Sequence, residues 1–299
     1  MKKFSFLVVL NFLMVSLYAQ SVSDFEIQGN DDGTMTILNY KGTAQDIVIP
    51  EKIFNMPVTR LIEGAFKNKG LTSVVIPGTI SIIGNEVFRE NQLVSVTIPA
   101  SVTFIGDYAF YGNQLTNITI PQNVEYIGNF AFQRNRLVSI IIPNSVKTVN
   151  NAAFANNQIA TATIGSGVVC IGEEAFANNS LGSITIPDSV AYIGNRAFYG
   201  NERITNIVLG NGLTYIGESA FYNTRVTSII IPPSVVYIGT AAFETYGRVG
   251  TLNNITIGMY VLGSNSFSNN NNFDTFYKNN NYRKAGRYTC SNGTWSYTP

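Results

Sequence analysis

The sequence predicts a repeat solenoid, a coil of short β-strands and loops with little helix. One pattern recurs along most of the chain, as in LTSVVIPGTISIIGNEVFRENQ from Leu71 and LVSVTIPASVTFIGDYAFYGNQ from Leu93. Within each copy apolar and polar residues alternate, which is typical of a strand with one buried face. A unit of this length cannot enclose a core alone, whereas stacked units can. The chain is therefore expected to coil, with the equivalent strands of successive units side by side in one parallel sheet.

The copies are regularly spaced. From Leu71 to Leu181 each step is 22 residues, and the later steps are 23, 22 and 26. A looser first unit starts at Ala44, and the last unit ends near Phe267. The ten starts are Ala44, Leu71, Leu93, Leu115, Leu137, Ile159, Leu181, Ile204, Val226 and Leu252.

Certain residue types recur at fixed places in the unit. A proline such as Pro121 follows most strands and should end their pairing, because proline has no N–H to donate; glycine replaces it at Gly165, Gly210 and Gly258. A later glycine predicts a left-handed backbone, since glycine tolerates positive φ; Ile62 replaces it in the first unit, where we expect a different turn. The glycines are Gly84, Gly106, Gly128, Gly172, Gly194, Gly217, Gly239 and Gly263.

Two further columns concern the core. A phenylalanine stands four residues after each glycine, as at Phe88 and Phe110, and predicts a stacked spine. Asparagines close the units and are expected to bond to backbone groups of adjacent units through their amides. These asparagines are Asn91, Asn113, Asn135, Asn157, Asn179 and Asn201.

These residues resemble the BspA-like branch of the leucine-rich-repeat family, whose pattern is LxxIxIPxSVxxIGxxAFxxC. The segment LGSITIPDSVAYIGNRAFYGN, from Leu181, matches that pattern closely, with asparagine in place of the final cysteine. The resemblance covers Ala44 to Phe267 and implies a right-handed coil with a parallel β-sheet on its concave face. Members of the family occur on oral bacteria and spirochaetes. The resemblance therefore implies adhesion to a host matrix protein, a host cell or another microbe's surface.

The first residues are predicted to direct export. Residues 1–19 have the features of a signal peptide, because Lys2 and Lys3 precede an apolar run and Ala19 offers a cleavage site. The apolar run is too short to favour a spanning helix, and no other stretch could cross a bilayer. We expect an exported protein, located at the cell surface, outside the cell or in the periplasm.

Three more segments are expected after the signal peptide. Residues 20–43 should form an N-terminal β cap, a hairpin that turns at Asp32-Gly33. Residues 44–268 are the solenoid. Residues 269–299 are a polar loop followed by a hairpin with Asn292-Gly293 at its tip. This tail is either a cap or a segment for surface attachment, and the sequence leaves both open.

The composition argues against catalysis. The chain has no histidine, which removes the commonest general base and the commonest transition-metal ligand. Only 12% of its residues are charged and the net charge is +1, so no basic field for nucleic acid is expected. Cys170 and Cys290 lack a metal-binding spacing and are expected to be separate thiols. We predict a protein without enzymatic activity, cofactor or metal.

Two sets of side chains form the candidate binding surface. The outward strand positions are uncharged apart from Asp46, and they could hold an extended peptide or simply be solvated. A tyrosine row stands before the glycines, interrupted at Thr148 and Cys170, and could serve recognition or pack as a ladder between units. The candidates are Ser95, Thr97, Asn117, Thr119, Thr161, Thr163, Ser183, Thr185, Tyr126, Tyr192, Tyr215 and Tyr237.

Two hypotheses about function follow. The first is an adhesin that binds a host or microbial protein. The second is a periplasmic or secreted scaffold that captures a hydrophobic ligand or assembles with itself as a homo-oligomer, since exposed apolar patches favour association.

Overall fold

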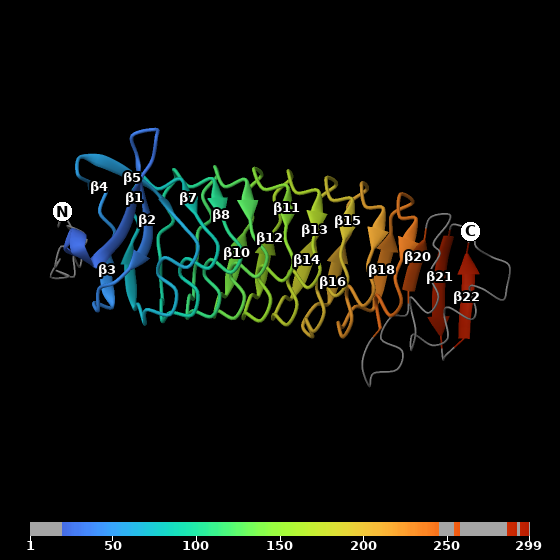
Figure 1. Ribbon diagram of the computed structural model, residues 1–299. Coiled ribbons are helices and arrows are strands. Elements are labelled where there is room, and N and C mark those ends of the chain that lie inside the picture. The colour runs from blue at the N-terminus through green and yellow to red at the C-terminus, as the bar shows by residue number, and fades with distance from the viewer. Residues whose placement is uncertain (1–19, 245–253, 258–285, 292–293, 299) are drawn as a thin grey trace, which may run out of the picture.

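The computed structural model describes residues 20–244, 254–257, 286–291 and 294–298. They form an elongated β-solenoid that runs from the blue N-terminal end to the red C-terminal end (Figure 1). A single 3-10 helix, η1 (Val22–Asp24), is the only helix in this part of the chain. The predicted repeat solenoid with little helix is confirmed.

A hairpin precedes the first coil. Strands β1 (Phe25–Gly29) and β2 (Met35–Tyr40) pair antiparallel, and Gly33 has φ +76° in the turn between them. Strand β2 then pairs in parallel with β5 (Met56–Leu61), which also pairs with β4 (Lys52–Ile53). The hairpin with Asp32-Gly33 at its turn is therefore present, and it continues directly into the sheet of the solenoid.

One sheet runs the length of the coil. It has twelve strands, most of them only two residues long, in the order β1-β2-β5-β7-β8-β9-β11-β13-β15-β17-β19, with β4 beside β5. These short strands lie immediately before the glycine of each unit. They are β7 (Ile82–Ile83), β8 (Phe104–Ile105), β9 (Tyr126–Ile127), β11 (Thr148–Val149), β13 (Cys170–Ile171), β15 (Tyr192–Ile193), β17 (Tyr215–Ile216) and β19 (Tyr237–Ile238).

The segments before the prolines form a second strand series. These strands pair only two by two in the coil, as β3–β6, β10–β12, β14–β16 and β18–β20. The prediction that they stack into one sheet is therefore wrong. The strands are β3 (Asp46–Val48), β6 (Ser73–Val75), β10 (Ser139–Ile141), β12 (Thr161–Thr163), β14 (Ser183–Thr185), β16 (Asn206–Val208), β18 (Ser228–Ile231) and β20 (Asn254–Ile257).

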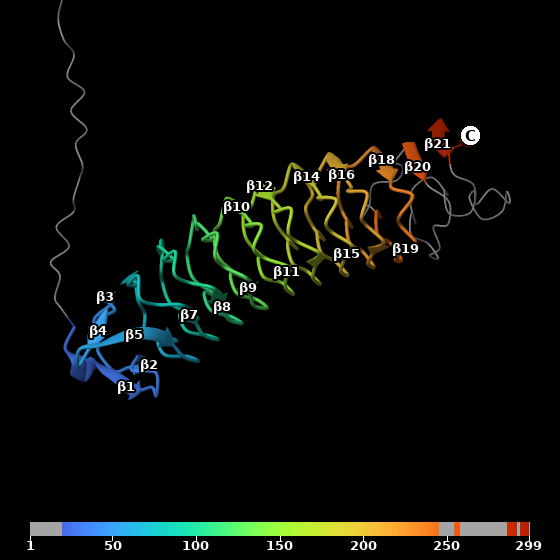
Figure 2. The ribbon, with the colours of Figure 1, turned by 90° about the horizontal axis from the view of Figure 1, so that it is seen from above.

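The bend of the coil explains which series pairs continuously. Figure 2 shows the twelve-stranded sheet along the inner side of the bend and the second series along the outer side. The outer arc is longer, so its strands cannot all stay within the ~4.8 Å that ladder pairing requires. Pairing ends at or before the residue that precedes the proline, as at Val75 before Pro77, which agrees with the predicted role of proline.

The repeated glycines from Gly84 to Gly239 do not have the predicted left-handed backbone, and Gly263 lies outside the described residues. The positive φ lies two residues later, at residues such as Glu86, Tyr108 and Arg196, with φ between 54° and 56°. A side chain at the glycines is excluded instead by the previous turn, since a Cβ on Gly84 would lie 2.8 Å from Leu61 O. Glycine is therefore required by close approach of the backbone.

The first unit keeps the same corner. Gly64 has φ +68° at the position of Glu86, so the different turn expected for this unit is wrong. Ile62 stands where later units have glycine, but its neighbour is strand β2 of the N-terminal hairpin and not the corner of another unit. Its N–H donates to Ile37 O of β2 at 3.2 Å.

The phenylalanine spine is confirmed over the described residues. Eight pairs of successive rings from Phe66 to Phe243 stack with centroids 5.1–5.6 Å apart. All nine rings are buried, at 0–3% exposure. Phe267 lies outside the described residues. The rings fill the centre of the coil with apolar surface that no single unit could cover.

The asparagine column is also confirmed as a bridge between units. Asn113 donates to Phe88 O of the preceding unit at 2.8 Å, and within its own unit it accepts from Leu93 N at 3.1 Å and donates to Phe110 O at 3.1 Å. The other five asparagines make the same three bonds. Each amide satisfies buried backbone groups that no strand ladder reaches.

The C-terminal tail extends the outer strand series. Strands β21 (Gly286–Ser291) and β22 (Thr294–Thr298) pair antiparallel, and β21 pairs antiparallel with β20. The sheet order β18-β20-β21-β22 is consistent with a cap. The predicted tip at Asn292-Gly293 lies outside the described residues.

Loss of one asparagine amide should destabilise the coil. We expect Asn135→Ala to lower the free energy of unfolding by about 1–3 kcal/mol, because three buried backbone groups lose their partner. The measurement is the midpoint of urea unfolding. Asn117→Ala, at an exposed position outside any strand, is the control and should change the midpoint little. Equal midpoints for the two variants would contradict the bridging role.

Close approach at the corner can be tested with alanine. Gly128→Ala places a Cβ 2.5 Å from the carbonyl carbon of Gly106, so we expect a loss of about 1–3 kcal/mol from overpacking. Gly182→Ala is the matched control, because a Cβ there meets nothing within 4 Å. Thermal unfolding of both proteins checks this prediction. A Gly128→Ala protein as stable as the control would mean that the corner is not tightly packed.

Candidate functional site

The candidate binding residues lie on two different sides of the coil. The eight serine, threonine and asparagine candidates are all exposed. Four of them lie in strands β12 and β14 of the outer series, and Ser95, Thr97, Asn117 and Thr119 lie in equivalent segments that form no strand. Tyr126, Tyr192, Tyr215 and Tyr237 belong to the inner sheet, in β9, β15, β17 and β19. Figure 2 shows the two series along opposite sides of the bent coil. The sequence suggested both sets as candidates for binding, and the structure does not bring them together in one site.

We call the outward side chains of the outer strand series the outer face. Apart from Asp46, its described side chains are uncharged. It combines hydroxyl groups with exposed apolar side chains, of which Ile141 is 63% and Ile230 is 68% exposed. Large aliphatic groups this exposed leave apolar surface in water, so the outer face favours contact with another molecule.

The outer face is hollowed between β12 and β14. A depression of about 460 Å³ is lined by Thr161, Thr163, Ser183 and Thr185, four of the predicted binding residues, together with Ala162 and Pro187. Ala162, between the two threonines of β12, pairs with Ile140 of β10 and stands where β14 has Ile184. The side chain is smaller there, and β12 and β14 are not paired. Hydroxyls and methyl groups line a shallow trough suited to an extended chain.

The tyrosines of the inner sheet form a ladder. Tyr192 and Tyr215 stack at 4.6 Å, Tyr215 and Tyr237 at 4.6 Å, and Phe104 and Tyr126 at 4.8 Å. The rings therefore cover each other's faces and present their edges to solvent. Burial raises the pKa of Tyr126, Tyr192 and Tyr215, so their hydroxyls stay protonated at neutral pH. Packing between units is thus shown for the ladder, and a recognition role is left as a proposal for the exposed edges.

The interruption of the ladder holds a free cysteine. Cys170 is half-buried and unbridged, and burial raises the pKa of its thiol. A protonated thiol is a weak nucleophile, so this side chain has no sign of activation. Thr148 of β11 and Cys170 of β13 pair directly in the sheet, so two small side chains separate Tyr126 from Tyr192.

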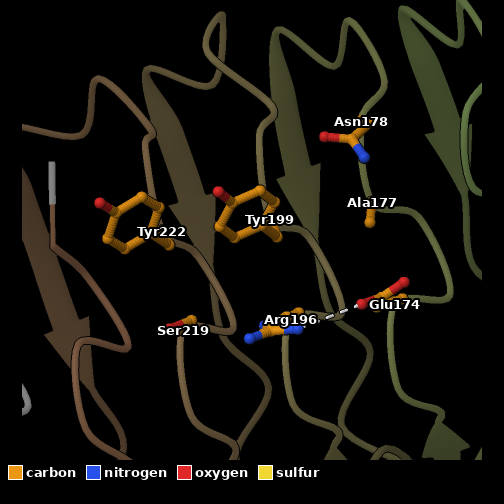
Figure 3. A pocket seen from close by; sticks show the side chains of 7 residues that line it. All are labelled: Glu174, Ala177, Asn178, Arg196, Tyr199, Ser219 and Tyr222. Atoms are coloured by element: carbon orange, nitrogen blue, oxygen red, sulfur yellow. Dashed lines mark ion pairs between the residues drawn. The ribbon is translucent and has the colours of Figure 1, made fainter. Parts of the chain in front are cut away.

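A third side of the coil carries a pocket that sequence reasoning did not identify. It lies where the chain turns after each phenylalanine, beside Ala177, Tyr199 and Tyr222 (Figure 3). The tyrosine column at Tyr111, Tyr199 and Tyr222 is visible in the sequence. The signal for the pocket was the change from Ala155 and Ala177 to Tyr199 and Tyr222 at this position of the unit.

The part of the chain that the structure describes has neither a metal-binding cluster nor a membrane-spanning helix. Residues 20–244 and the short strands after them contain no group of three or more His, Cys, Asp or Glu side chains that could hold a metal ion. In that part of the chain no helix is both long enough and apolar enough to cross a bilayer.

Comparison with known proteins identifies the repeat. The BspA type leucine rich repeat region matches residues 59–181 and 169–294, in 6 copies. A leucine-rich repeat protein from Bacteroides ovatus is similar in structure, with a TM-score of 0.71 and 25% identity over 83% of this chain and 68% of that protein. The pneumococcal vaccine antigen PcpA has a similar fold, with a TM-score of 0.52 and 19% identity over 80% of this chain and 82% of the antigen. No curated protein matches the chain.

The packing role of the tyrosine ladder gives a direct prediction. Cys170→Tyr should place a ring against Tyr192 and stabilise the coil by about 0.5–1.5 kcal/mol, the contribution of one stacked aromatic pair. Thermal unfolding of this variant is compared with that of Cys170→Ser, which removes the thiol without adding a ring. A Cys170→Tyr protein less stable than Cys170→Ser would contradict the ladder as a packing device.

Proposed function

Because the chain belongs to the family of BspA-type leucine-rich-repeat proteins, we propose that it is a non-enzymatic, exported solenoid that binds a protein partner at the cell surface. Proteins with this repeat are typically surface proteins, and leucine-rich repeats generally mediate protein interactions. The family is also generally non-enzymatic. The partner that the family resemblance suggests is a host matrix protein or another microbe's surface.

The observation that supports protein binding is the character of the outer face. Its exposed isoleucines and valines alternate with serine, threonine and asparagine. Between Val75 and Ile230, none of the described side chains on the outer face is charged. The apolar groups favour burial against a partner, while the hydroxyls can pair with its polar groups. The trough beside Ala162 supplies a concave point on this otherwise regular surface.

The division of the chain supports export. We keep residues 1–19 as a signal peptide, 20–43 as the N-terminal cap, 44–268 as the solenoid and 269–299 as the loop and hairpin tail. Residues 1–19 lie outside the described residues. The tail pairs with the last outer strand, which supports a capping role, and attachment to the surface is the alternative.

A scaffold that assembles with itself is the second candidate. Exposed Ile141 and Ile230 on an uncharged face also suit contact with a second copy of this chain. In that case the outer face would be buried in a homo-oligomer and would not be available to a host protein.

Lysine substitutions on the outer face test the binding proposal. We expect Ile141→Lys with Ile230→Lys to weaken capture of fibronectin, fibrinogen or whole cells by about tenfold or more, because charge is introduced into an apolar contact. Val169→Lys with Val236→Lys is the matched control. Val169 and Val236 are exposed, at 48% and 61%, and they lie in a column that already contains Lys147.

Two outcomes would contradict this proposal. Equal effects of the two lysine pairs would exclude the outer face as the binding site. Full protection from protease on intact cells, until the outer membrane is opened, would exclude surface display. Sedimentation velocity distinguishes the scaffold alternative, which predicts that the protein is an oligomer. Only the lysine pair on the outer face, Ile141→Lys with Ile230→Lys, should dissociate that oligomer.

A further inference from the structure

The pocket on the third side of the coil has features that the proposed function does not use. It measures about 340 Å³ and is separate from the outer face and from the tyrosine ladder of the inner sheet. Figure 3 shows Tyr199 between Tyr222 and Ala177, with Asn178 on one side and the Glu174–Arg196 pair on the other. A pocket of this size is at the lower end of the range for small-ligand sites.

A break in a column of side chains creates the pocket. The residue after each phenylalanine is aromatic at Tyr199 and Tyr222, whose rings stack at 5.2 Å with planes 8° apart. The same position holds Ala155 and Ala177 in the two preceding units, and both are buried against Tyr199 in a small alanine cluster. One ring face of Tyr199 is therefore covered by the ring of Tyr222 in the following unit. The other face points toward the preceding unit, which supplies only the methyl group of Ala177.

Polar groups of both kinds surround this ring face. Glu174 Oε1 lies 3.6 Å from the guanidinium of Arg196, and both side chains are partly exposed, at 39% and 53%. The pair offers an acceptor and a donor side by side with no net charge. Asn178 is exposed, and its Nδ2 donates to Asn156 Oδ1 at 3.3 Å, which leaves the Asn178 carbonyl directed away from that bond.

We infer that this pocket binds a neutral pyranose sugar unit. A pyranose has an apolar C–H face, which suits the part of the Tyr199 ring face that the small Ala177 side chain leaves uncovered, and a rim of hydroxyls that both donate and accept. Neighbouring hydroxyls can donate to Glu174 and accept from Arg196, and bonds to charged groups are the stronger ones. The sugar would occupy the position of the ring that Ala177 lacks. An anionic sugar is disfavoured, because Glu174 would lie next to its charge.

Filling the pocket is the most specific test. Ala177→Tyr repeats what Tyr199 and Tyr222 do in the following units, so the coil should accept it while the sugar position is lost. Tyr199→Ala removes the stacking face instead. Ile230→Lys, on the outer face, is the control and should leave sugar binding unchanged. Circular dichroism and the unfolding midpoint show that each variant is folded.

The measurement is saturation-transfer NMR on the full chain. The probes are the methyl glycosides of glucose, galactose, mannose and N-acetylglucosamine, with glucuronate as a charged comparison. We expect at least one neutral glycoside to bind with Kd of about 1 mM, with most saturation on one C–H face, and both pocket variants to weaken it roughly tenfold or more.

Three results would overturn the inference. They are no binding of any neutral glycoside, binding that both pocket variants leave intact, and binding of glucuronate alone. Loss of fibronectin or cell capture in Ala177→Tyr without any sugar signal would also overturn it and would assign the pocket to a protein partner. Because Ile230→Lys affects the outer face alone, failure of the sugar site and failure of the proposed protein binding remain distinguishable.

Discussion

The structure depends on the attachment of each turn to the turn before it. A single unit has no core of its own, so its stability comes from contact with its neighbours. Two devices fix that contact. The buried asparagine amides bond to backbone groups of the preceding unit, as Asn113 does to Phe88, and the glycine corners let the backbones approach without an intervening side chain. Both devices set the distance between turns at one strand spacing.

A fixed distance between turns brings equivalent residues of successive units into columns. Where a column holds rings, they stack, as in the phenylalanine spine and the tyrosine ladder. Both hollows lie beside a small residue of such a column. Ala162 lines the trough on the outer face, and Ala177 lines the pocket beside Tyr199. The two sites proposed for recognition therefore lie at exceptions to the repeat.

Periodicity explains how much could be predicted from the sequence. The spine and the asparagine bridges were predictable, because each follows from a residue type repeated at one place in the unit. The glycine conformation was misassigned, since glycine satisfies either a positive φ or a close approach, and only the neighbouring turn distinguishes them. The break in the outer sheet depends on the bend of the whole coil, which no single unit encodes. For the same reason, the sequence could not place the two sets of candidate residues on opposite sides of the coil.

Native-state hydrogen exchange tests this account most directly. The amide N–H groups of Leu93, Leu115 and Leu137, each at the start of a unit, donate to the asparagine that closes the unit and also bonds to the unit before it. If these bridges hold the turns together, their exchange should be among the slowest and should report global unfolding. Amides of the unpaired outer segments near Asn117 should exchange much faster. Fast exchange at the three leucines, with slow exchange along the outer segments, would contradict the account.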